Sequence, residues 1–432
     1  MRRFRDCAAP CEMRKQAMNA DIAEQRFIAL DTVRGVAVMG ILLLNIIGFS
    51  MPEAAYINPR AYGGATGADL WVYLVNFVLF DGKMRGLFSF LFGASLVLVT
   101  ERAEAKGENP ARVHYSRMLW LLVFGLAHLW LVWWGDILAH YALVGAIAFF
   151  FRDKPVASLV RIGIGLLVLE TLLMCGIPMG VLALQQNWAN ASAAEMAKAL
   201  VEFEKAFGVP PAAYIADQLA LFRGSYEAIL RDRFGHHVLS PLGMLSFSGP
   251  ETLGYMLLGM ASLKSGLLTG AWERKRYWKW MLVCFAIAIP AYVAIAAYMV
   301  RENFSVFATG LGVMTASVPF RPLMILAWAC LILLLMRPGG ALTTRIAAAG
   351  RMAFSNYLFT SLICTTLFYG YGLGLYGHLS RWQVYLVVLA IWALMLLWSK
   401  PWLERFRFGP LEWLWRSLAR LRLQPIRGGA IG

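Results

Sequence analysis

The sequence predicts an all-α, polytopic integral membrane protein with about ten transmembrane helices and both termini in the cytoplasm. Hydrophobic residues make up 59% of the 432 positions and charged residues only 15%, against about 45–50% and about 25% in soluble domains. Forty Lys and Arg outnumber 25 Asp and Glu and give a formal net charge of +15. The composition excludes a water-soluble enzyme, and a chain this apolar leaves no basic face for nucleic acid.

Nine apolar runs are long enough to cross a bilayer, since a membrane helix needs about 20 apolar residues. They cover residues 33–50, 118–134, 137–151, 157–184, 249–265, 279–299, 312–336, 352–373 and 382–399. A tenth stretch, residues 69–100, is too long for one plain helix, and each of its halves is too short to span comfortably. Positive charge indicates how often this stretch crosses, because cytoplasmic flanks carry the excess Lys and Arg.

A single crossing of residues 69–100 places 29 of the 40 Lys and Arg on the inner side. A double crossing would reverse every later loop and put the basic segment 272–280 outside. We therefore predict one broken crossing, interrupted by Asp81, Lys83 and Arg85. Charged, irregular backbone at this depth is tolerated where protein buries it or water reaches it. A short cytoplasmic hairpin loop is the alternative for this stretch.

The remaining organisation follows from charge and aromatic content. Residues 1–29 form a basic cytoplasmic segment, and residues 30–399 form the transmembrane bundle with an outer helical cap at 185–248. Residues 400–432 form a basic tail whose interleaved Trp and Arg are typical of a helix in the membrane interface.

Two helices are expected in the cap. Ser192 followed by Glu195 predicts a capping box that begins an amphipathic helix. A second helix is expected through residues 212–234.

Ionisable side chains inside apolar runs are costly, so each marks a candidate functional site. His128 stands out because imidazole titrates near neutral pH and can act as an acid or a base. Asp136 follows about two turns later, and Asp136 with His140 forms an i, i+4 pair. A carboxylate beside an imidazole fixes its tautomer, as general-base catalysis requires. The alternative is a structural hydrogen bond between two helices.

Glu251 and Arg34 each allow two interpretations. Glu251 begins a span, where it could equally meet the helix dipole. Arg34 follows Asp31 by three residues at the head of the first span, so it could form an interfacial ion pair or bind a phosphorylated ligand. Cys/His metal spacing, a Gly-rich phosphate loop and a nucleophile elbow are all missing, so the sequence predicts no metal site and no serine hydrolase.

Five blocks of sequence carry a family resemblance. They are LDTVRGVAVMGILLLNI (30–46), LFDGKMRGLFSFLFGASLVLVTERAEAKG (79–107), HLWLVWWGDILAHYALVG (128–145), GRMAFSNYLFTSLICTTLFYGYGLGLYG (350–377) and RFRFGPLEWLWRSL (405–418). They resemble the YeiB-like family of bacterial inner-membrane proteins, which is defined by a domain of unknown function. The resemblance covers essentially residues 20–427 and implies a multi-pass protein of the bacterial inner (plasma) membrane.

That family is similar in turn to the transmembrane acyltransferases, which include heparan-α-glucosaminide N-acetyltransferase and bacterial O-acyltransferases that modify surface glycans. The shared piece is Arg34-Gly35 with a polar residue eleven positions after the arginine, here Asn45. O-acyltransferases carry His at that position, whereas the N-acetyltransferase branch has Asn and takes its histidine from the following outer loop. Here that loop contains no His. Because Asn45 cannot act as a base, His128 with Asp136 is the candidate base.

The sequence thus predicts an acyltransferase that moves an acyl group from cytoplasmic acyl-CoA, acetyl-CoA being the expected donor, to a hydroxyl or amine of an envelope or exported acceptor. The acceptor is a small molecule or a glycan, the bilayer is the other partner, and an oligomer is compatible with the sequence. The expected catalytic residues are His128, Asp136 and Asn45, and the expected substrate-binding residues are Arg34, Asp81, Lys83, Arg85, His140, Glu251 and Asn356. A proton-coupled transporter or exporter and a non-catalytic membrane scaffold are the alternatives.

Overall fold

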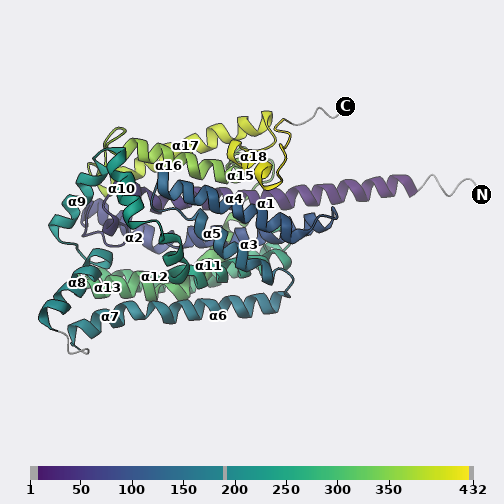
Figure 1. Ribbon diagram of the computed structural model, residues 1–432. Helices are drawn as coiled ribbons and strands as arrows, with labels where there is room; N and C mark the ends of the chain where they lie inside the picture. Colours follow the sequence, from purple (N-terminus) through teal and green to yellow (C-terminus); the bar gives the residue numbers. More distant parts are fainter. Residues whose placement is uncertain (1–7, 188–191, 428–432) are drawn as a thin grey trace, which may run out of the picture.

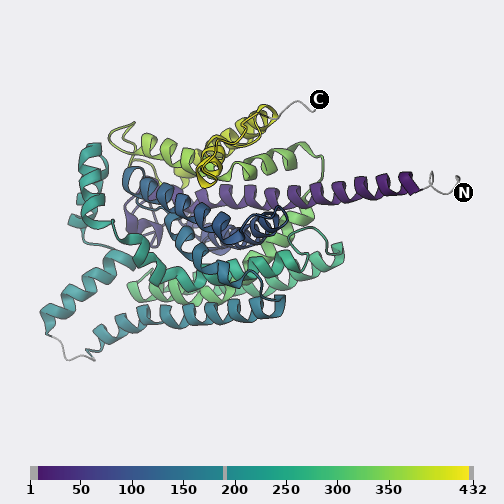
Figure 2. The ribbon, with the colours of Figure 1, turned by 45° about the vertical axis from the view of Figure 1, so that its right-hand side comes forward.

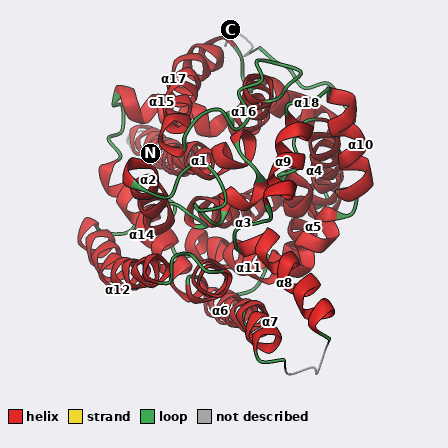
Figure 3. Cartoon of the chain, turned by 90° about the vertical axis from the view of Figure 1, so that its left-hand side faces the viewer, coloured by secondary structure: helices red, strands yellow, loops and turns green. Residues whose placement is uncertain are grey.

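The computed structural model describes residues 8–187 and 192–427, and these residues form helices and connecting loops without a strand (Figure 3). The first half of the chain contains α1 (Ala8–Ser50), α2 (Gly67–Leu79), α3 (Lys83–Glu104), α4 (Pro110–Leu131), α5 (Leu138–Ala148), α6 (Val156–Met174), α7 (Gly176–Gln185) and α8 (Ala193–Phe207). The second half contains α9 (Ala212–Phe222), α10 (Tyr226–His236), α11 (Ser240–Lys264), α12 (Arg274–Arg301), α13 (Val306–Thr309), α14 (Arg321–Leu335), α15 (Ala341–Arg351), α16 (Ala353–Phe368), α17 (Arg381–Arg405) and α18 (Pro410–Ala419).

Most of the long helices run along one common axis (Figure 1). The two chain ends lie at the same end of the bundle, which we call the terminal end, and α1 projects beyond the other helices there (Figure 2). Helices α8, α9 and α10 gather at the opposite end, which we call the cap end (Figure 1). An even number of crossings is consistent with this placement of the chain ends.

Six helical segments among the described residues are long and apolar enough to cross a membrane. They are Ile28–Ser50, Gly67–Glu104, Val156–Gln185, Arg274–Arg301, Val306–Leu335 and Arg381–Arg405. The runs expected at 137–151 and 352–373 appear as shorter apolar helices, and those at 118–134 and 249–265 belong to the more polar α4 and α11. A helical membrane protein is therefore supported, whereas the full count of ten crossings stays a prediction.

Burial separates central helices from peripheral ones. The apolar part of α1 is 83% buried within the protein, and α1 and α3 lie near the middle of the bundle in the view along its axis (Figure 3). The corresponding parts of α6, α12 and α17 are only 28% buried. Their outer faces carry exposed leucines such as Leu172, Leu282 and Leu386. An apolar surface of this size on several helices is typical of contact with lipid.

The charged stretch around Asp81 interrupts the helical segment 67–104, as predicted. Helix α2 ends at Leu79, Gly82 adopts a left-handed conformation with φ of 70°, and α3 begins at Lys83. Helix α2 packs on α12 and α17, whereas α3 packs on α11, α1 and α14. The two halves follow one another along the bundle (Figure 1), which is the arrangement of one interrupted segment rather than of a hairpin.

Two pairs of helices approach so closely that only glycine fits between them. A methyl group on Gly259 of α11 would lie 1.7 Å from the Phe90 carbonyl oxygen of α3. One on Gly350 of α15 would lie 1.9 Å from the Asp31 carbonyl oxygen of α1. Small residues at such crossings allow the close backbone contact that membrane helices use for association.

The cap and the tail differ in part from expectation. The capping box is confirmed, because the Ser192 hydroxyl accepts from the Glu195 N–H at 3.3 Å and the Glu195 carboxylate accepts from the Ser192 N–H at 2.9 Å. The prediction of a single helix at 212–234 was wrong, because this stretch is divided into α9 and α10. Gly224 lies between the two helices, and the Ser225 side chain caps the N-terminus of α10.

The expected interfacial tail packs against the bundle. Helix α17 continues to Arg405, and α18 lies on α4 and α16. The Glu412 carboxylate of α18 is buried and accepts hydrogen bonds from the N–H groups of Phe354 and Ser355 at 2.8 and 3.1 Å. It therefore caps the first turn of α16, where a carboxylate is favoured.

Candidate functional site

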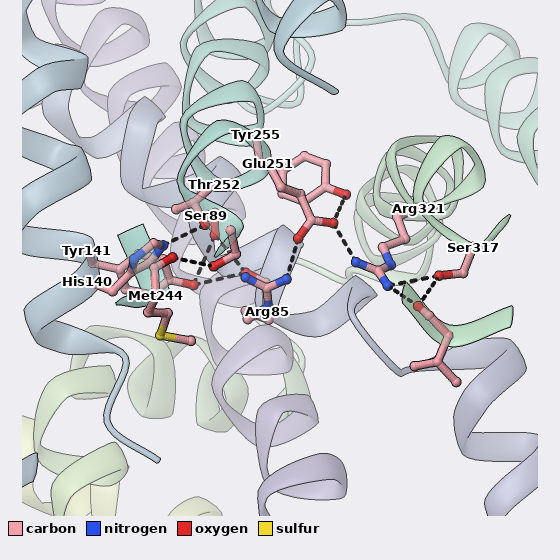
Figure 4. Close-up of polar contacts among 12 residues, drawn as sticks. Arg85, Ser89, His140, Tyr141, Met244, Glu251, Thr252, Tyr255, Ser317 and Arg321 are labelled. Carbon is pink, nitrogen blue, oxygen red and sulfur yellow. Dashed lines mark hydrogen bonds and ion pairs between the residues drawn. The ribbon is translucent and has the colours of Figure 1, made fainter. Parts of the chain in front are cut away.

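A chain of ionic contacts crosses the interior of the bundle (Figure 4). The Glu251 carboxylate of α11 receives Arg85 of α3 on one oxygen and Arg321 of α14, at 2.7 Å, on the other. The Tyr255 hydroxyl donates to the same carboxylate at 2.9 Å. Glu251 lies in the middle of α11, which begins at Ser240, so the helix-dipole reading of this residue was wrong. Two arginines on one carboxylate leave positive charge at this point.

Arg321 was not among the predicted site residues, and an unusual backbone holds it in place. Residues Gly310–Ala316 form a π-helix, a conformation often found at functional sites. The Arg321 guanidinium donates to the Val313 carbonyl at 2.6 Å and to the Ser317 hydroxyl at 2.8 Å. The available signal was a lone arginine inside an apolar run.

The cations of the broken segment are held by the protein. Lys83 is fully buried, donates to the Phe77 carbonyl, and lies 3.4 Å from the centre of the Tyr292 ring. Asp81 is half-buried in the turn before Gly82. Arg85 keeps 24% of its side chain exposed. None of these three residues lines the large cavity described below, which weakens the expectation that they bind donor phosphates.

His128 and Asp136 form a buried dyad at the turn between α4 and α5. His128 Nδ1 lies 2.7 Å from Asp136 Oδ2. Asp136 Oδ1 accepts from the Ala139 N–H at 2.9 Å, so the carboxylate also holds the start of α5. The expected contact between Asp136 and His140 is absent, because His140 turns away toward Thr252, with 2.9 Å between Nε2 and Oγ1. His128 Nε2 is buried and has no hydrogen-bond partner among the residues that the structure describes.

A cavity of about 1330 Å³ is lined in part by α18 and the loop before it, which lie toward the terminal end (Figure 1). It exceeds the roughly 300–1,000 Å³ typical of small-molecule sites. Its lining includes nine basic side chains: Arg34, Arg102, Lys106, Arg117, Arg351, Lys400, Arg407, Arg416 and Arg420. Of the sequence-predicted site residues, Arg34 alone lines it. The remaining basic residues come from α3, α4, α15, α17, α18 and the connections near them, far apart in the sequence.

The carboxylates of this cavity are already engaged. Asp31 pairs with Arg34 at 2.7 Å, Glu404 pairs with Lys400, and Glu412 caps α16. Three carboxylates against nine cations leave a strongly positive lining. Such a lining favours a ligand with several negative charges.

The cavity reaches the vicinity of the dyad. Ile137 and Leu138, which directly follow Asp136, line it together with Phe354 and Tyr357. The Tyr357 ring lies 5.3 Å from the His128 ring, centre to centre. Tyr357 was missed by sequence reasoning, although it sits in the block 350–377 next to the predicted Asn356.

Asn45 and Asn356 occupy different environments. Asn45 lines a second, much smaller hollow together with Tyr357, Thr360 and Ser361. Asn356 donates to the Ala349 carbonyl and to the Ser399 hydroxyl and accepts from the Trp398 indole N–H, at 3.0, 3.2 and 2.9 Å. Its amide therefore ties helices together and is not directed at a ligand.

Sequence comparison shows the family of this chain. It is 33% identical over 400 residues to YeiB of Escherichia coli (strain K12), across 91% of this chain and 96% of the relative. The chain belongs to the YeiB-like family. It is also 30% identical over 429 residues to YxaH of Bacillus subtilis (strain 168), across 95% of this chain and 98% of that relative. Both relatives are described as uncharacterized proteins.

A family model supports the same assignment. The model described as a protein of unknown function, DUF418, matches residues 262–422. This part of the YeiB-like chain contains Tyr357 and several basic residues of the cavity, whereas the dyad lies before it. No solved structure matches the chain.

Proposed function

We propose that this YeiB-like protein is an integral-membrane acyltransferase that moves an acyl group from acyl-CoA to a hydroxyl or amine of an envelope or exported molecule. One observation carries the proposal: a cavity lined by nine basic side chains extends to Ile137, Leu138 and Tyr357, which adjoin the His128–Asp136 dyad. Coenzyme A carries several phosphates at one end and the thioester at the other, so one molecule matches both ends of this cavity. Acetyl-CoA is the first donor to test.

The dyad supports general-base chemistry. Asp136 accepts a hydrogen bond from the Nδ1–H of His128. The imidazole then has no proton on Nε2, which is left as a hydrogen-bond acceptor. In the proposed reaction, the oxygen or nitrogen of the acceptor attacks the thioester carbon, and His128 Nε2 takes the proton that this hydroxyl or amine loses. The carbon–sulfur bond then breaks, and the imidazolium returns the proton to the departing thiolate. No metal is required.

The proposal includes a location and a topology. The basic terminal end faces the cytoplasm, in accord with the inner-side excess of Lys and Arg, so the donor enters from the cytoplasm. The protein crosses the bacterial inner membrane ten times, and the cap end meets the acceptor outside.

Donor binding is tested by titrating the purified protein with acetyl-CoA in a calorimeter. Replacing Arg351 and Arg416 by Gln removes two cavity cations, and since charge-assisted hydrogen bonds contribute about 1.5–3 kcal/mol, we expect at least a ~10-fold loss of affinity. The matched control, Arg231→Gln with Arg301→Gln, removes two exposed charges outside the cavity. Unchanged affinity in the cavity variant, or no saturable binding at all, contradicts the proposal.

The catalytic half is tested by Asp136→Asn. An amide can still accept from the Ala139 N–H, but its NH₂ group would face Nδ1 and favour the wrong imidazole tautomer. We expect transfer to fall by about 10²–10⁴-fold with little change in thermal stability. The measurement is release of free thiol from acetyl-CoA with solubilised cell envelope as the source of acceptor. Full activity in this variant, or in His128→Ala, contradicts a base role for the dyad.

A proton-coupled transporter is the second candidate, supported by the interior contacts of Arg85, Glu251 and Arg321. Ionisable residues buried in a membrane bundle often mark a transport path. His140 Nδ1 and Glu170 Oε2 are also buried without a hydrogen-bond partner. A transporter would move labelled solute into proteoliposomes without consuming a thioester, and a scaffold would do neither.

A further inference from the structure

Two hollows of the protein share one wall. Tyr357 lines both the large basic cavity and the small hollow beside Asn45, and the two share only Val38, Ile41 and Tyr357. The small hollow measures about 10 Å³, which is room for about one water molecule. Tyr357 is the polar member of this shared wall.

The part of the large cavity next to the dyad offers few hydrogen-bond donors. Ile137, Leu138 and Phe354 present apolar groups. The Tyr141 hydroxyl is engaged, because it contacts the Arg85 carbonyl at 3.1 Å and the Ser89 hydroxyl at 3.0 Å. The Tyr357 hydroxyl lies near the Ile137 backbone N–H but donates its own proton to no protein atom.

The unused groups around Tyr357 form a cluster. His128 Nε2 and the Tyr357 hydroxyl are both buried and have no hydrogen-bond partner among the described residues. The centres of the two rings are 5.3 Å apart. One is an acceptor and the other a donor. Buried polar groups are nearly always satisfied, so two unpartnered groups on neighbouring rings favour a ligand with a donor and an acceptor of its own.

We propose that the Tyr357 hydroxyl binds the thioester carbonyl oxygen of the acyl donor and stabilises the oxyanion that forms on it. This inference rests on the acyltransferase function proposed above. When the acceptor oxygen or nitrogen attacks the carbonyl carbon, the C=O electron pair moves to oxygen, and the Tyr357 O–H donates to that negative charge. When the C=O bond re-forms, the carbon–sulfur bond breaks, and the proton held on His128 Nε2 passes to the thiolate.

Asn45 cannot take this role from its observed position. Its side chain lines the one-water hollow and does not line the cavity that would hold the donor. Tyr357 stands between the two spaces, so a thioester arriving from the basic cavity meets the tyrosine first. Asn45, which the sequence predicted as a catalytic residue, is therefore not the group that binds this carbonyl in the proposed reaction.

The test is infrared difference spectroscopy of acetyl-CoA labelled with ¹³C at the carbonyl. A hydrogen bond polarises the carbonyl, so we expect the band of the bound donor below that of the free donor. Tyr357→Phe removes only the hydroxyl, and its band should return to the free position. The control, Tyr376→Phe, removes another buried unpartnered hydroxyl that lines neither hollow and should leave the band shifted.

Turnover provides a second readout. Loss of one oxyanion donor lowers kcat by about 10²–10³-fold, and calorimetric affinity for acetyl-CoA should change far less. If Tyr357→Phe fails to fold, 3-fluorotyrosine at position 357 replaces it, because the more acidic hydroxyl should shift the band further. A bound donor whose band is unshifted, or is equally shifted in Tyr357→Phe, overturns this inference alone. Absence of acetyl-CoA binding overturns the proposed function as well.

Discussion

Glu251 is the shared counter-ion of two arginines that lie far from it in the sequence. Its side chain is 1% exposed, and both of its oxygens are engaged by guanidinium groups. Replacing it with Gln would leave Arg85 and Arg321 without a counter-charge in the interior. Removing one partner of a buried ion pair costs about 3–5 kcal/mol, so we expect the Glu251→Gln variant to unfold at clearly lower temperature in detergent.

Glu302→Gln is the matched control for this substitution. Glu302 pairs with Arg301 at 3.0 Å, but the side chains are 39% and 78% exposed. Exposed pairs contribute only about 0–1 kcal/mol, so this variant should unfold as the native protein does. Equal stability of the Glu251→Gln and Glu302→Gln proteins would contradict a structural ion-pair chain.

Sequence separation explains which parts of the site could be predicted. His128 and Asp136 are eight residues apart on either side of a tight turn, so local helical geometry was enough to pair them. Arg85 and Glu251 are 166 residues apart, and Arg321 is 70 residues further on. Only the packing of α3 against α11 and α14 brings them together. Tyr357 was missed because an aromatic residue in a span ordinarily reads as lipid-facing or core.

At the scale of helices, the crossing of α3 and α11 depends on glycine. A side chain at Gly259 would collide with backbone of α3, which cannot move as a flexible side chain can. We therefore expect Gly259→Leu to separate the helices and cost about 3 kcal/mol or more. Thermal unfolding followed by tryptophan fluorescence measures the loss. These two helices carry Arg85 and Glu251, so separating them should also break the ion pair between these residues. The variant should therefore unfold at lower temperature even when no acyl-CoA is present.

Gly165 of α6 provides the control for that crossing. Nothing lies within 4 Å of a methyl group added there. Alanine is favoured over glycine in a helix by about 1 kcal/mol, so Gly165→Ala should be neutral or stabilising. A Gly259→Leu protein as stable as Gly165→Ala would show that the close crossing does not hold the bundle.

Helix interiors were easier to predict than helix limits. Apolar runs located α6, α12 and α17 because their outer faces carry an unbroken apolar surface. Helix α11 was predicted to begin near residue 249 but begins at Ser240, since Pro241 and Pro250 and several polar residues obscure its first turns. The break between α9 and α10 was missed because Gly224 in a helical pattern is tolerated often enough to be ambiguous.

For the whole molecule, the excess of positive charge has two consequences. It first indicated topology, because most of the basic residues fall between apolar runs on one side. The structure gathers nine of them around one cavity, drawing them from α1, α3, α4, α15, α17, α18 and the connections near them. Lys and Arg residues that flank the apolar runs in the sequence can therefore also line one binding cavity once the helices pack.

That double role makes the topology itself a prediction. If the terminal end is cytoplasmic, a fluorescent protein that matures only in the cytoplasm should be bright when fused after Leu423 or inserted at Gly270, in the loop between α11 and α12. The same reporter inserted at Asn303, after α12, should be dark, and alkaline phosphatase should give the opposite pattern at all three positions. A second crossing within residues 67–104 would reverse the signals at Gly107, Gly270 and Asn303 relative to a fusion at the N-terminus. A reporter that is bright at the N-terminus and dark at Gly107 would therefore contradict a single crossing, and with it the cytoplasmic entry of the donor.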